Sequence, residues 1–248
     1  MRDAFSALMF RRLVIFRRSP IDDLSMLARA LVGGVAVYWF ARTYAPNDQN
    51  FVVASFIVFT WVSNIVIGTC FEVANDLRSS AFLTVMMARF NPFWYFFAQG
   101  VQQAVSWSAQ ALLLAVIFLF PSIGLGGLAW FVASAFLSFA GVFGTAAILA
   151  MWTSKYRWFY YASTVSGFML TFAGALYPLT VFPRWLQIAS LANPFTHYVD
   201  LMRSALTGTP TLIPVGWQLV VVCASGAALS TLGVFACRRL TADVQLRT

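Results

Sequence analysis

Charged residues are scarce in this sequence. They make up 10% of its 248 positions, whereas a water-soluble domain carries about 25%. Hydrophobic residues make up 60%, compared with about 45–50% in soluble proteins. Because one bilayer crossing takes about 20 apolar residues, the chain has room for roughly six crossings and for no additional soluble domain. The composition therefore predicts a protein that lies almost entirely in the membrane.

Motifs for nucleotide binding and for hydrolysis are also missing. The chain contains no G-x-x-x-x-G-K-[ST] phosphate loop, so it cannot bind and hydrolyse a nucleotide by that route. The patterns H-E-x-x-H, C-x-x-C and G-x-S-x-G are absent as well. His197 is the only histidine, and no Asp or Glu lies deep within the long apolar runs. Membrane enzymes and ion-coupled carriers ordinarily need such groups at membrane depth, so we expect neither an enzyme nor a metal or cofactor site.

Cysteines are few. Cys70, Cys223 and Cys237 all fall within apolar runs. An odd number of cysteines in such surroundings argues against a disulfide framework. We interpret all three as small core residues.

Six long apolar runs predict an all-α integral membrane fold with six transmembrane helices in a single domain, residues 1–248. The predicted spans are residues 24–41, 51–71, 93–120, 128–152, 158–176 and 215–237. Ahead of them, residues 1–20 alternate apolar side chains and arginines at helical spacing. This pattern is typical of a helix that lies at the membrane interface, and no cleaved signal peptide is expected.

The distribution of basic residues predicts the orientation. All of the 16 Lys and Arg residues except Arg42, Arg184 and Arg203 fall on the side of the N terminus. The positive-inside rule then places both termini in the cytoplasm of a cell that carries the protein in its inner membrane. The net charge of +8 follows from this topology and does not require nucleic acid as a partner.

Two connections are longer than simple turns. The first, residues 72–92, is predicted to be cytoplasmic and to contain a short helix that could dock onto a soluble partner, because acidic residues precede it and Arg89 ends it. The second, residues 177–214, is apolar but interrupted by prolines. Within it, residues 181–191 are too few to cross, so we expect a re-entrant segment in the outer leaflet. The residues that mark it are Tyr177, Pro178, Pro183 and Trp185.

The same outer connection contains the polar residues His197, Asp200 and Arg203. Asp200 and Arg203 are three positions apart, and we expect them to form a modest surface pair. His197 is expected to be structural.

Polar residues form a stripe on the third predicted span. Gln99, Gln103, Ser106 and Gln110 share one helical face, and Trp107 lies next to it. Polar groups that face lipid are costly, so the stripe should face other helices or a polar path. Two interpretations stay open: Trp107 and the glutamines line a substrate path, or they form interhelical hydrogen bonds and packing contacts. Small residues on the fourth span (Ser134, Ser138, Gly141, Thr145) and the fifth (Ser163, Gly167, Thr171, Gly174) indicate close helix packing.

The outer connection also carries a family resemblance. The residues 174–178 (GALYP), 182–186 (FPRWL) and 193–198 (NPFTHY), followed by Arg203, resemble in order and spacing the C-terminal half of type-2 ABC exporter permeases. With the six spans, the interfacial helix and the helix between spans two and three, the resemblance covers essentially the whole chain.

The resemblance implies a permease subunit that pairs with a second copy, in a homodimer or heterodimer, and with a separate ATP-binding-cassette ATPase. ATP and Mg would bind to that ATPase and not to this chain. The helix after span two would be the coupling helix, with Glu72, Asp76, Arg78 and Phe82 at the contact, and the proline-broken segment would cap the exit path.

The substrate class follows from the resemblance as well. Residues 12–20 look more like those of drug, antibiotic or lipid-type exporters than those of glycan exporters, so an amphipathic substrate moved outward is expected. The alternatives are a glycan or glycolipid permease of the same family, a six-span membrane enzyme, and a channel or ion-coupled carrier. The missing intramembrane ionisable groups disfavour the last two.

Overall fold

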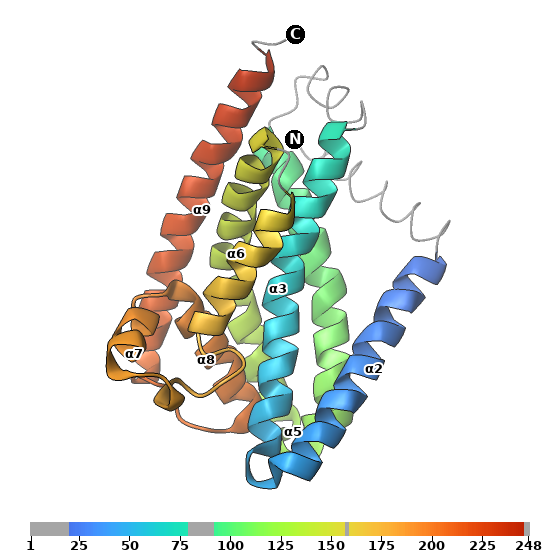
Figure 1. Ribbon diagram of the computed structural model, residues 1–248, viewed down its shortest axis with the longest axis vertical. Coiled ribbons are helices and arrows are strands. Elements are labelled where there is room, and N and C mark those ends of the chain that lie inside the picture. The colour runs from blue at the N-terminus through green and yellow to red at the C-terminus, as the bar shows by residue number, and fades with distance from the viewer. Residues whose placement is uncertain (1–19, 79–91, 157–158, 246–248) are drawn as a thin grey trace.

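The computed structural model describes residues 20–78, 92–156 and 159–245. Within these ranges the chain is helical apart from short connections, which confirms the predicted all-α class (Figure 1). The helices are α2 (Pro20–Tyr44), α3 (Gln49–Arg78), α5 (Pro92–Tyr156), α6 (Phe159–Phe172), α7 (Arg184–Leu191), α8 (Pro194–Thr207) and α9 (Val215–Gln245), with 3-10 turns η1 (Pro46–Asp48) and η2 (Leu179–Val181). The expected interfacial helix lies outside the described residues, except for its last residue, Pro20.

The longest helix, α5, folds back on itself. Its 65 residues contain a break at Gly124, whose φ of 60° and ψ of −167° are non-helical, and Pro121 lies just before the break. Proline removes a backbone donor and glycine tolerates positive φ, so the chain can reverse here. The two arms, residues 92–123 and 125–156, run antiparallel, and the ring of Phe97 packs against that of Phe143 with centroids 5.6 Å apart.

Helix α3 lies at the centre of the bundle, where it contacts α2, α5, α6 and α8 (Figure 1). Its Trp61 side chain is almost fully buried, as are Tyr95 and Phe131 from the two arms of α5 and Tyr198 from α8. The core is therefore built by segments that are far apart in the sequence around one central helix.

Three described helices are long and apolar enough to cross a membrane: Pro46–Val73, Trp94–Trp152 and Val215–Ala236. The second of these includes both arms of α5, so it has the length for two crossings. Helix α6 has 14 residues and would extend about 21 Å at 1.5 Å per residue. It is shorter than the expected span 158–176, because the helix ends at Phe172 and a turn follows in which Gly174 adopts a φ of 70°.

The second arm of α5 and helix α9 approach each other closely at glycines. A Cβ atom on Gly144 would overlap the backbone of Leu229, and one on Gly233 would lie 3.0 Å from the carbonyl oxygen of Gly144. The small residues Ser134, Ser138 and Thr145 on the same arm are buried. The burial of these residues agrees with the packing role predicted for the small residues on this arm. Gly144, which meets the backbone of Leu229, was not among the predicted residues, although only small side chains let two helix backbones come this near.

We predict that Gly144→Ala lowers the free energy of unfolding by about 1–3 kcal/mol, because the added methyl group forces α5 and α9 apart. Unfolding of the purified protein in detergent measures the change. Gly216→Ala is the matched control, since a Cβ there meets nothing within 4 Å. Equal stability of the two variants would show that the close approach of α5 and α9 is not required.

Candidate functional site

The residues predicted to contact an ATPase lie at or beyond one end of α3. The helix continues without a break from Gln49 to Arg78, so Glu72, Asp76 and Arg78 belong to its last turns. Phe82 and most of the expected coupling helix lie outside the described residues. The contact with an ATPase stays a prediction.

The polar stripe on the first arm of α5 is turned toward α3. Gln103 is buried and lies on the backbone of Gly68, where a Cβ atom would be 2.7 Å from its Oε1. Trp107 Nε1 donates a hydrogen bond to the same Oε1 at 3.2 Å. Gln99 is buried as well, and its Nε2 lies 3.5 Å from the hydroxyl of Tyr95.

One buried oxygen of the stripe, Gln110 Oε1, has no hydrogen-bond partner among the described residues. The structure thus brings Gln99, Gln103 and Trp107 together at a helix interface. Their role in a substrate path stays a prediction.

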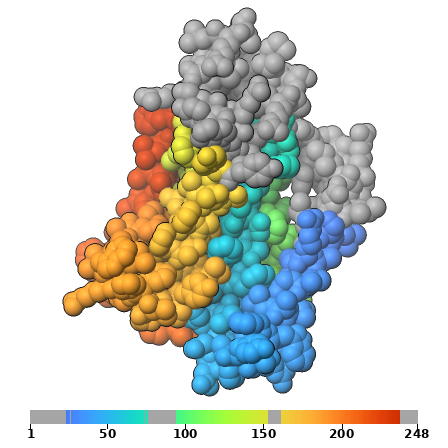
Figure 2. All heavy atoms as spheres, in the orientation of Figure 1, coloured from blue at the N-terminus to red at the C-terminus, as the bar shows by residue number. Residues whose placement is uncertain are grey.

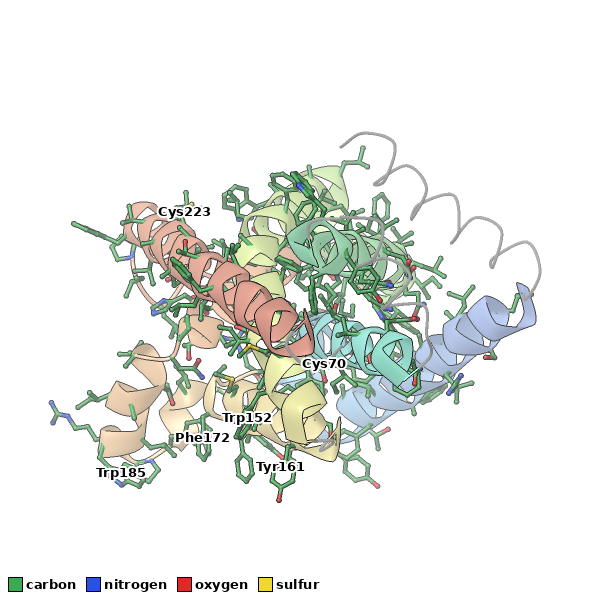
Figure 3. The ribbon with its side chains drawn as sticks, turned by 90° about the horizontal axis from the view of Figure 1, so that it is seen from above. Cys70, Trp152, Tyr161, Phe172, Trp185 and Cys223 are labelled. Atoms are coloured by element: carbon green, nitrogen blue, oxygen red, sulfur yellow. The ribbon has the colours of Figure 1, made fainter. Side chains whose placement is uncertain are left out.

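The expected re-entrant segment forms the short elements η2 and α7. Pro178 precedes η2 and Pro183 precedes α7, each with the extended ψ that a helix start requires. Tyr177 is exposed, and Trp185 on α7 points away from the bundle with 70% of its surface exposed (Figure 3). This segment therefore presents aromatic side chains at the edge of the molecule.

Helix α8 follows in the same connection and lies inside the protein. It starts where the Asn193 side chain accepts a hydrogen bond from the backbone N–H of Phe195, and it ends at Gly208, which is left-handed with a φ of 68°. Both are typical helix caps. Most of its residues are buried against α3, α5 and α9, so the outer connection contains a core helix that the sequence analysis did not predict.

The surface position predicted for Asp200 and Arg203 was wrong. Their side chains are 6% and 7% exposed and form an ion pair of 3.1 Å. Arg203 also donates to the carbonyl oxygen of Gly174 at 2.9 Å and lies 4.5 Å above the ring of Phe51 on α3. Burial lowers the pKa of Arg203 and the Asp200 carboxylate opposes this shift, so the guanidinium stays charged. The pair is buried because α8 packs inside the bundle and carries both residues with it.

Two further residues extend this network to α7 and α9. Gln218 Nε2 donates to the backbone oxygen of His197 at 3.0 Å and lies 3.3 Å from Asp200 Oδ2. The His197 ring lies with Nε2 2.9 Å from the carbonyl oxygen of Leu191, and the backbone N–H of Leu212 donates to Asp200 Oδ2 at 2.8 Å. The structural role predicted for His197 agrees with these contacts. Gln218 was missed, although an amide within the apolar run 215–237 was a signal for an internal partner.

The cysteines do not share one environment. Cys70 is buried as predicted, whereas Cys223 is exposed, so the core position predicted for it was wrong (Figure 3). The side chain of Cys237 lies outside the described part of the chain. Among the described residues, His, Cys, Asp and Glu nowhere form a group of three that could hold a metal ion.

We predict that Arg203→Met lowers the free energy of unfolding by about 3–5 kcal/mol, because it leaves the buried Asp200 carboxylate without its counterion. The double variant Asp200→Asn with Arg203→Met should be closer to the wild type, since no buried charge remains. Denaturant unfolding in detergent measures both. A loss no larger than that of the exposed control Arg184→Met would refute a structural role of the pair.

Comparison with known proteins agrees with these features. No curated protein matches the chain significantly. The sequence profile of the family described as ABC-2 type transporter matches residues 3–207, which include the outer connection as far as the end of α8. The match covers most of the chain, and the apolar helices described above are those of a multi-pass membrane protein. The chain therefore belongs to the ABC-2 type transporter membrane family and is a permease subunit of an ATP-binding-cassette transporter.

Proposed function

We propose that this chain is the permease of an exporter that moves an amphipathic substrate, such as a drug, an antibiotic or a lipid-like molecule, outward across the cell membrane. A separate ATPase subunit would supply the energy, in keeping with the absence of a phosphate loop from the sequence. In this proposal the chain crosses the membrane six times, with both termini in the cytoplasm and with η2 and α7 dipping into the outer leaflet.

The proposal rests on the observation that the buried charges are paired with each other. Among the described residues, the buried acidic and basic side chains are His197 and the pair Asp200 and Arg203. The ring nitrogens of His197 contact Gln218 and Leu191, whereas the charges of the pair neutralise each other. Ion-coupled transporters use ionisable groups at membrane depth to bind the driving ion. Here the two charges hold helices together, which supports a cycle that is powered from outside the chain.

Helix α3 offers a route for that energy. Its 30 residues extend about 45 Å at 1.5 Å per residue. The part from the predicted ATPase contact at Glu72 to Phe51 makes up roughly 32 Å of this length. There the ring of Phe51 lies under Arg203 of α8. A displacement of α3 by the ATPase would therefore reach the network that anchors α7 and α8, and we propose that these helices open and close the exit.

A second copy of the permease would pack against α6. This helix lies uncovered on the face that Figure 2 shows, and a Cβ atom on Gly167 would meet nothing within 4 Å. Tyr161, Phe168 and Phe172 are exposed on the same helix, and the labelled Tyr161 and Phe172 point away from the bundle in Figure 3. A helix with an open small residue between exposed aromatic side chains is suited to close contact with another helix.

We predict that Glu72→Arg lowers ATP-driven transport and substrate-stimulated ATP hydrolysis by about fivefold or more, because it reverses a charge at the proposed contact with the ATPase. Proteoliposomes that contain the permease and its ATPase measure both activities. Asp48→Arg makes the same charge change at the opposite end of α3 and should have little effect. Equal activity of the two variants would refute the assignment of this end of α3 to coupling.

We predict that Gly167→Trp separates the two permease copies, because the indole would occupy the space that the partner helix needs. Light scattering of the detergent-solubilised protein measures the mass. Gly216→Trp adds the same side chain at another open position, where a Cβ also meets nothing within 4 Å, and should leave the dimer intact. A dimer that survives Gly167→Trp would place the second copy on another face.

A further inference from the structure

A large cavity lies between the two arms of α5 and helix α9. Its volume is about 970 Å³, at the upper end of the roughly 300–1,000 Å³ that is usual for ligand sites. Ala109 of the first arm, Phe136 of the second arm and Ala227 of α9 are among the lining residues, and Trp61 of α3 lies at the wall. The cavity is distinct from the stripe of Gln103 and Trp107, neither of which lines it.

The wall of the cavity offers almost no free hydrogen-bonding group. Trp61 Nε1 donates to Ser108 Oγ at 2.8 Å, and Ser230 Oγ donates to the carbonyl oxygen of Ala140 at 2.7 Å. The polar atoms of these lining side chains are thus already bonded within the protein. A water molecule needs two to four polar partners, so the cavity suits a hydrocarbon chain.

The cavity is open toward the bilayer. Val105 and Phe136 at its rim are 65% and 78% exposed, and Ala109, Cys223 and Ala227 are exposed as well. These residues lie near the middle of each arm of α5, within the apolar segment Trp94–Trp152, and near the middle of Val215–Ala236. The medium at this height is lipid hydrocarbon.

The open side is also separate from the proposed contact between permease copies. Cys223 lies on the opposite side of the bundle from Tyr161 and Phe172 of α6 in Figure 3. No residue of α6 lines the cavity. A second copy that packs on α6 would therefore leave the cavity open to lipid.

We propose that this cavity binds one acyl chain of a membrane phospholipid, which enters sideways from the bilayer between the first arm of α5 and α9. Packing against the chain replaces the dispersion contacts that an empty cavity would lose. The bound chain fills the space between these helices on the side where glycine contacts do not join them. The site depends on the position of the helices in the bilayer, and it needs neither the ATPase nor the transported substrate.

Native mass spectrometry tests the proposal. The full-length chain is reconstituted in nanodiscs of phosphatidylethanolamine and phosphatidylglycerol with a brominated acyl chain, released in mild detergent, and weighed. We expect one retained phospholipid for each wild-type chain. Ala227→Trp and Ala109→Phe fill the cavity from opposite walls, and each should lower the bound fraction about tenfold or more.

Ala228→Trp is the matched control, because Ala228 is exposed on the same helix but does not line the cavity. It should retain the lipid. Thermal unfolding and gel filtration of each variant test whether the fold is intact. Because the two cavity-filling variants lie on separate helices, loss of lipid in both would exclude a local distortion of one helix as the cause.

Three results would overturn the proposal. The first is a wild-type chain without retained phospholipid, and the second is equal retention in all variants. The third is a variant Ala227→Trp that separates copies of the chain but keeps its lipid, since the cavity would then be an interface. Because the measurement uses no ATPase and no substrate, failure of the proposed export function would not change its outcome.

Discussion

The ion pair between Asp200 and Arg203 lies where α8 meets the turn after α6, the segment before α9 and helix α3. Arg203 contacts the carbonyl oxygen of Gly174 in the turn after α6 and the ring of Phe51 on α3. Asp200 accepts a hydrogen bond from the backbone N–H of Leu212, in the segment before α9. An isolated charge in this position would be expensive, whereas a pair with its remaining hydrogen bonds satisfied can be accommodated. The pair therefore contributes to the position of α8, together with the apolar side chains that this helix buries in the bundle.

The rest of the bundle is held together in another way. In a bilayer the hydrophobic effect does not drive helices together, because lipid is as apolar as the side chains. Close contact of backbones provides the packing energy instead, and Gly144 against Leu229 on α5 and α9 is the clearest example. Where such contacts are missing between α9 and the first arm of α5, the helices leave a cavity.

These two modes of packing suggest a division of roles in a permease. Helix α3 is continuous and central, and it connects the proposed ATPase contact at Glu72 with the polar network around Arg203. The tightly packed pair of α9 and the second arm of α5 would serve as a rigid support. The polar network is a suitable place for a change of state, because its hydrogen bonds can be exchanged for others at lower cost than backbone contacts can be repacked.

Much of the fold could be predicted from the sequence, because composition and local apolar runs report on the medium and on helix formation. The all-α membrane class and the small-residue packing on the second arm of α5 were obtained in this way, whereas the transporter family came from the resemblance of residues 174–178, 182–186 and 193–198 to known permeases. The site was harder to predict, because the element that a side chain faces depends on contacts between segments that are distant in the sequence. Periodicity placed Gln103 on a polar face, but only the fold showed that Gly68 of α3 is its neighbour.

The sequence by itself determined the all-α membrane class, which is encoded in local residue patterns, and the family, through the resemblance of its outer connection to known permeases. The tertiary structure alone decided that Asp200 and Arg203 are buried, that Cys223 is exposed and that α8 is a core helix. The physical reason is that burial is a property of the assembled bundle. The same charged pair is at the surface or in the core depending on which helices pack around it.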